Sequence, residues 1–172
     1  MNNLETFFAV WEREAQKTVE MLRMLPAGQY DFRPDASGRS LGELAWHLAE
    51  LDAYVSFGVA SGSFSAEAKP PNIKRPMTIE ALAPGYKQIH EEAKERLRAL
   101  TALDLDKKIQ FFGSTLTVNS LLWDAMLLHL IHHRGQLSLL VRLAGSVVPS
   151  IFGPTREQSQ SRRAAQNTKP ER

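Results

Sequence analysis

The chain has 172 residues, of which 43% are hydrophobic and 23% charged, a composition that predicts a single globular domain. It contains no cysteine, which excludes disulfides, thiolate metal sites and a cysteine nucleophile. The N-terminus lacks the pattern of a secretory signal, and the most apolar stretch, residues 121–144, is interrupted by charged and polar side chains. We therefore expect a cytoplasmic protein that does not enter a membrane.

The net charge of +2 is unevenly distributed along the chain. Residues from Arg156 onward carry a charge of +3, which leaves the first 155 residues at −1. The folded part thus offers no basic face, and we expect no nucleic-acid partner. A Gln/Ser/Arg-rich end follows Gly153-Pro154 without apolar periodicity, so we predict one domain over 1–153 and a disordered basic tail over 154–172.

Four segments have the three-and-four apolar spacing of amphipathic helices. The second begins with Ser40 and Glu43 at the spacing of a capping box. The third contains Pro84, which predicts a kink or a later start. The predicted helices span residues 4–25, 40–60, 78–100 and 120–144.

Two connections between these helices carry further information. Residues 61–77 form a long link with three prolines between the second and third helices. Residues 108–118 alternate around Gly113-Ser114, which favours a small β-hairpin between the third and fourth helices. The fold class predicted is all-α: a four-helix bundle with a long connection between helices two and three and this hairpin.

The candidate functional residues are histidines. His129 and His133 fall on one predicted inward stripe of the last helix, with Cβ atoms about 6 Å apart. Two imidazoles at that spacing can bind one ion at about 2.0–2.1 Å. His47, at the border of the apolar stripe of the second helix, can supply a third ligand. Three imidazoles and an open position are typical of a catalytic metal site.

Other roles stay open for several of these side chains. Histidines on a helix can also be packing residues with hydrogen-bond partners. We expect His132 at the rim and His90, beside two glutamates, to be exposed. Asp52 and Asp124 are possible acceptors for imidazole N–H groups. The His-Glu-x-x-His motif of zinc proteases and the Glu-x-x-His pairs of di-iron bundles do not occur.

Two stretches resemble the DinB/YfiT superfamily over about residues 3–145. They are Leu44-Ala-Trp-His47-Leu-Ala-Glu-Leu and His129-Leu-Ile-His-His133-Arg-Gly-Gln136-Leu. The resemblance implies a four-helix bundle, usually a homodimer, with a metal site on His47, His129 and His133. The resemblance implies zinc or nickel as the bound ion, with iron or manganese as alternatives.

The resemblance leaves two kinds of function open. Some relatives are thiol S-transferases that use bacillithiol, mycothiol or glutathione, and others hydrolyse or isomerise thiol adducts. The first expectation is a metal-dependent transferase or hydrolase with a low-molecular-weight thiol cosubstrate. The alternative is a non-catalytic, stress-associated metal-binding protein that acts through its dimer.

Overall fold

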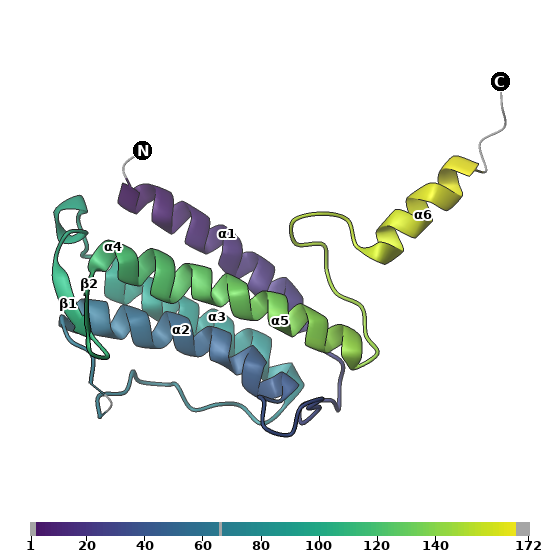
Figure 1. Ribbon diagram of the computed structural model, residues 1–172, viewed down its shortest axis with the longest axis horizontal. Coiled ribbons are helices and arrows are strands. Elements are labelled where there is room, and N and C mark those ends of the chain that lie inside the picture. Colours follow the sequence, from purple (N-terminus) through teal and green to yellow (C-terminus); the bar gives the residue numbers. More distant parts are fainter. Residues whose placement is uncertain (1–2, 66, 168–172) are drawn as a thin grey trace.

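The computed structural model describes residues 3–65 and 67–167 and has the predicted architecture, a four-helix bundle with a small hairpin at one end (Figure 1). Helix α2 packs against α3 on one side and the fourth helical segment on the other, and α1 closes the bundle. The first three helices are α1 (Asn3–Arg23), α2 (Leu41–Ser61) and α3 (Ile79–Leu97). In the described part of the chain no helix is long and apolar enough to cross a membrane.

Helix α2 begins with the predicted capping box. The backbone N–H of Glu43 donates to Ser40 Oγ at 3.2 Å, and Glu43 Oε2 accepts from the N–H of Ser40 at 2.8 Å. Because both orphan donors are satisfied, the helix has a defined start. It ends at Gly62, whose φ of 71° favours glycine. This start and end fix the position of His47 along the bundle.

The fourth helical segment is not uniform. It consists of a first turn, α4 (Val118–Ser120), a π-helical stretch, η2 (Leu121–Leu128), and α5 (His129–Leu143). A π-helical bond closes over five residues instead of four, so the stretch rotates all later side chains relative to a regular helix. The buried residues of α5 are Leu130, Arg134, Leu137, Leu140 and Val141.

The predicted inward stripe is confirmed at Leu137 and Leu140, but between Leu130 and Leu137 the buried residue is Arg134 and not His133. His129 is exposed and His133 half-buried, whereas we expected both on the core face. They lie instead at the edge of the core, towards α2 and towards solvent.

Helix α3 begins at Ile79 and continues through Pro84, so the expected later start is wrong. The predicted hairpin is confirmed: β1 (Lys108–Phe111) pairs antiparallel with β2 (Ser114–Thr117). A short 3₁₀ turn, η1 (Ala102–Asp104), precedes it. The turn itself consists of Phe112 and Gly113, with φ of 44° and 86°, one residue earlier than predicted.

The long connection between α2 and α3 is held against the bundle by hydrogen bonds to its backbone. Trp46 Nε1 donates to the carbonyl of Ile73 at 3.1 Å, and the Tyr30 hydroxyl donates to the carbonyl of Pro76 at 2.6 Å. Four residues from the first part of this connection, Ser63, Phe64, Ser65 and Ala68, lie beside α2 and the hairpin. The connection therefore covers one side of α2.

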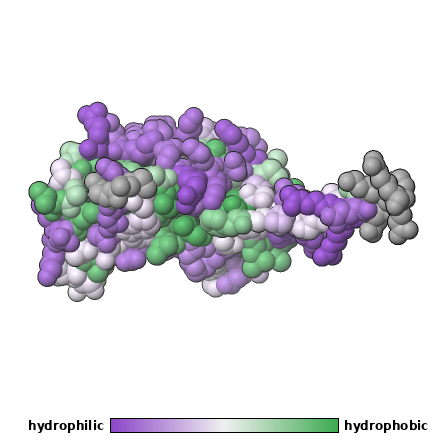
Figure 2. All heavy atoms as spheres, turned by 90° about the horizontal axis from the view of Figure 1, so that it is seen from above, coloured by the Kyte–Doolittle hydropathy of each residue, from purple (hydrophilic) through white to green (hydrophobic). Residues whose placement is uncertain are grey.

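The predicted tail contains a helix, α6 (Arg156–Asn167), which projects from the bundle and is mostly hydrophilic (Figures 1 and 2). The helix lies within the segment that we predicted as a tail, and residues 168–172 of that segment lie outside the described ones. Arg142 Nη1 and Glu157 Oε1 form an ion pair at 2.5 Å that links α6 to α5. This carboxylate has its pKa lowered to about 2 by the guanidinium.

Candidate metal centre

The structure brings the three predicted histidines together. One nitrogen each of His47, from α2, and His129 and His133, from α5, lies within 4.8 Å of the other two. Nε2 of His129 and Nε2 of His133 face each other at 2.8 Å. The ring centroid of His47 lies 4.7 Å from that of His133 and 5.8 Å from that of His129. The cluster thus spans two neighbouring helices of the bundle.

The second ring nitrogen of each histidine has an acceptor. Nδ1 of His47 lies 2.8 Å from Glu50 Oε2, and Nδ1 of His133 lies 2.6 Å from Gln136 Oε1. The ring of His129 donates to the backbone carbonyl of Ala125. Carboxylate and carbonyl oxygens accept, so each of these bonds places the proton on the outer nitrogen. The other nitrogen keeps its lone pair and is directed to the centre of the cluster.

The environment of the cluster lowers the pKa of two of its imidazoles, those of His129 and His133. Burial, which penalises the charged form, lowers the pKa of His133 to about 4, and the nearby His47 and His129 add to the effect. Burial, with a contribution from His47, also lowers the pKa of His129. At neutral pH two lone pairs therefore face each other at the His129–His133 contact, an arrangement that a cation between them would relieve.

The donor set fits a divalent metal ion. Two nitrogen ligands at about 2.1 Å in a tetrahedral site stand roughly 3.4 Å apart. The nitrogen separations in the cluster lie between 2.8 Å and 4.8 Å, so small side-chain movements would give that spacing. Three imidazole ligands would leave a fourth position of a tetrahedral ion open for a solvent molecule or a substrate.

Two residues of the cluster, His47 and His129, line an apolar pocket. This pocket has a volume of about 350 Å³, and its other lining residues come from α2 between Glu50 and Gly58, from the connection after α2 (Ser63, Phe64, Ser65 and Ala68), from the hairpin (Phe111 and Phe112) and from Ala125. Ligand pockets are typically of this size or larger and mostly apolar, with few polar groups. Two of the three candidate ligands thus border a cavity large enough for a small molecule.

Comparison with known proteins agrees with this geometry. The family model described as the DinB family matches residues 1–169 of the chain. The chain belongs to the DinB family. The predicted resemblance is therefore confirmed, and it covers the α6 segment as well as the bundle.

Individual relatives of this DinB chain are similar over most of their length. The uncharacterised protein YrdA of Bacillus subtilis strain 168 is 29% identical over 156 residues, which cover 90% of this chain and 91% of YrdA. A crystal structure of a DinB-like protein from Bacillus cereus ATCC 10987 matches with a TM-score of 0.71 and 28% identity, covering 86% of this chain and 97% of its own. The DinB-like protein YjoA of Bacillus subtilis shares the fold, with a TM-score of 0.68, 23% identity, and coverages of 87% and 99%.

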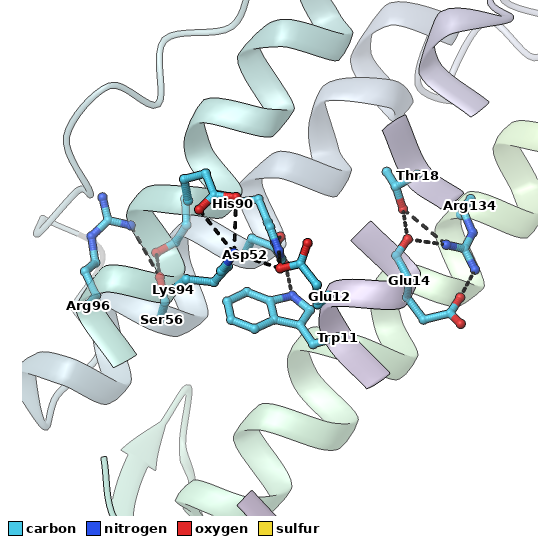
Figure 3. Close-up of polar contacts among 12 residues, drawn as sticks. Trp11, Glu12, Glu14, Thr18, Asp52, Ser56, His90, Lys94, Arg96 and Arg134 are labelled. Atoms are coloured by element: carbon cyan, nitrogen blue, oxygen red, sulfur yellow. Dashed lines mark hydrogen bonds and ion pairs between the residues drawn. The ribbon is translucent and has the colours of Figure 1, made fainter. Parts of the chain in front are cut away.

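His90, which we expected to be exposed, is 3% exposed in this DinB bundle and belongs to a second polar site (Figure 3). Its Nδ1 lies 2.8 Å from Asp52 Oδ2, and the other oxygen of Asp52 accepts from Trp11 Nε1 at 2.9 Å. Glu12 Oε2 lies 3.5 Å from His90 Nε2 and 2.7 Å from Lys94 Nζ. Both carboxylate oxygens of Asp52 thus accept hydrogen bonds within this second site.

Neither carboxylate that we predicted as an acceptor for the cluster is placed beside it. Asp52 binds His90 and Trp11, and Asp124 is exposed.

Arg134, within the His-His-Arg-Gly-Gln stretch, is a buried brace between α5 and α1 (Figure 3). Its guanidinium pairs with the Glu14 carboxylate and donates to the Glu14 carbonyl at 2.8 Å and to Thr18 Oγ1 at 3.2 Å. Because Arg134 is bound to α1, its contacts fix the orientation of α5 about the helix axis. In that orientation the preceding residue, His133, is directed to α2.

Sequence reasoning missed the two side chains that orient the cluster. Glu50 and Gln136 each follow their histidine by three residues, a spacing that puts both members of a pair on one helix face. That spacing could have identified Glu50 and Gln136 in the sequence as hydrogen-bond acceptors for the two imidazoles. His132, expected at the rim, is exposed, and its Nε2 accepts from Gln136 Nε2 at 3.0 Å, outside the cluster.

Proposed function

We propose that this DinB protein binds one divalent metal ion, zinc or nickel, through His47, His129 and His133 and acts as a metal-dependent thiol transferase or hydrolase. The observation that carries the proposal is the convergence of three imidazole nitrogens at the end of an apolar pocket. The bonds to Glu50 and Gln136 support it, because they leave the inner nitrogens free to act as ligands.

The bound ion would supply a positive charge that lowers the pKa of a coordinated thiol or water near neutral pH. The chain itself would provide the remaining functions. Glu50 and Gln136 hold two ligand rings in place, and the apolar walls exclude water from the reacting group. Glu50 is the carboxylate among the described lining residues, so it is the group that can accept a proton released inside the pocket.

The first test is metal content by elemental mass spectrometry on protein purified without an affinity tag. We expect about one ion per chain in the wild type and a loss of that ion in His133→Ala, whereas the matched control His132→Ala retains it. Circular dichroism establishes that each variant is helical. Wild-type protein that stays metal-free after incubation with zinc, nickel, iron and manganese would rule out the proposed site.

A second candidate, a non-catalytic metal-binding homodimer, is supported by an apolar strip on the outer face of the fourth helical segment. Leu128, Leu139 and Leu143 are exposed there. Their spacing puts them on one face of the helix, where they form an apolar strip. If the strip is a dimer contact, Leu139→Glu should give a monomer in light scattering while the metal content stays unchanged. A wild-type monomer at all concentrations would exclude this candidate.

A further inference from the structure

Phe112 is the least expected residue of the pocket lining. Its side chain is 78% exposed at the tip of the hairpin, and its φ of 44° lies in the left-handed region. Two-residue hairpin turns with two positive φ values favour Asn, Asp or Gly at this position. An exposed side chain on a strained backbone contributes little to the stability of the fold. Residues that have such unfavourable backbone conformations are often found at functional sites.

Phe112 continues a wall of aromatic rings. The ring centroids of Phe64 and Phe111 lie 4.8 Å apart with perpendicular planes, and those of Phe111 and Phe112 also lie 4.8 Å apart. Phe64 lies so close to α2 that a Cβ on Gly58 would stand 2.2 Å from its ring. Glycine at that position therefore lets the ring close one side of the pocket.

The charges around the pocket restrict what can enter it. Among the described residues that line it there is no lysine or arginine, and the one carboxylate, Glu50, already accepts from His47. An anionic group in contact with these walls would lose water without gaining a counter-charge. An uncharged apolar group loses nothing comparable and gains contact with the rings.

We propose that the substrate of this site is an uncharged molecule with an aromatic body and a single thiol, hydroxyl or carbonyl head. The body lies between Phe64, Phe111 and Phe112, and the head reaches the end formed by His47 and His129. The pocket of about 350 Å³ is roughly twice the 150 Å³ that accommodates benzene, so one or two rings fit. The placement of the head rests on the proposed function, whereas the placement of the body depends on the pocket alone.

Isothermal titration calorimetry on the full, zinc-loaded chain tests the charge selection with two thiols of similar size. We expect (4-methylphenyl)methanethiol to bind at least about tenfold more tightly than 4-(mercaptomethyl)benzoate, because the second carries a carboxylate on the same body. Equal affinities, or tighter binding of the benzoate, would overturn the proposal.

Variants test the aromatic wall. Phe112→Ala should weaken binding of the neutral thiol about fivefold, the value of one aromatic contact, and Ala68→Trp should abolish it by filling the pocket from an exposed loop position. The matched control Phe152→Ala removes a ring of similar exposure, 71%, outside the pocket and should change nothing. Unchanged affinity in both Phe112→Ala and Ala68→Trp would contradict the proposal.

Titration of the metal-free protein with toluene separates the two proposals. Toluene has a body and no head, so we expect it to bind wild-type protein with or without zinc and not to bind Ala68→Trp. If the metal test fails while toluene binding follows this pattern, the proposed function is wrong and the aromatic pocket stands. If zinc binds and toluene does not, the aromatic pocket is wrong and the metal site stands.

Discussion

The bundle contains two histidine sites with opposite electrostatics. In the three-histidine cluster, burial and neighbouring imidazoles lower the pKa of His133 to about 4. His90 is more deeply buried, yet its pKa is raised, because the hydrogen bond and charge of Asp52, with Glu12, outweigh the burial that would lower it. Burial alone therefore does not decide whether the pKa of a histidine is raised or lowered; at His90 the contact with Asp52 decides it.

The two sites also differ in what their geometry can do. His90 is surrounded by partners on α1, α2 and α3, which form a polar brace across the core (Figure 3). The cluster joins α2 to α5 and keeps three nitrogen lone pairs at the end of a pocket. The first arrangement is suited to holding helices together, and the second is suited to binding a cation. Three experiments test this division of roles.

The largest effect should come from Asp52→Ala. The change leaves Trp11 Nε1 and His90 Nδ1 without their buried acceptor, so we expect the free energy of unfolding to fall by about 3 kcal/mol. Urea denaturation measures this, and the exposed Asp124→Ala is the control, with little change. Metal content per folded chain should stay at the wild-type level. Loss of metal in Asp52→Ala would instead connect the two sites.

A smaller effect is expected from Gln136→Ala. The variant removes the acceptor that orients His133 and should weaken metal binding by about 10- to 100-fold without unfolding the bundle. Competition with a chelator of known affinity measures the change. Gln88→Ala, an exposed glutamine on α3, serves as control. An unchanged affinity in Gln136→Ala would show that the orientation of His133 does not depend on this bond.

The smallest effect is expected in how the free energy of unfolding of the metal-free protein depends on pH when His133 or His90 is replaced. The lowered pKa of His133 means that the unfolded chain binds more protons between about pH 4 and 6.5, so stability should rise with pH in that range. The raised pKa of His90 has the opposite sign: its contribution is complete below 6.5 and is lost as the pH rises through the folded value.

Denaturation at a series of pH values should therefore separate the two sites. His133→Ala should reduce the rise on the acid side, and His90→Gln should remove the decline on the alkaline side. A His90→Gln protein that retains the full decline above pH 6.5 would show that His90 is not its source.

Much of the bundle could be predicted from local patterns. The apolar spacing gave the four helices to within a few residues, Ser40 and Glu43 predicted the start of α2, and the alternation around Gly113 predicted the hairpin. These features depend on neighbours in the chain. Of the two outcomes predicted from Pro84, the later start is wrong, because α3 begins at Ile79 and includes the proline, whereas the kink stays a prediction.

The sequence by itself determined the set of metal-site candidates, since His47, His129 and His133 stand in motifs whose spacing follows the helical repeat. The tertiary structure decided how they are used. Contacts with Glu14 of α1 placed Arg134 rather than His133 in the core, and the packing of α2 against α5 brought His47 to the other two histidines. His90 and Asp52, 38 residues apart, could be paired only by the packing of α2 against α3. A regular repeat is a local property of the backbone, whereas the rotation of a helix and its partners depends on packing throughout the core.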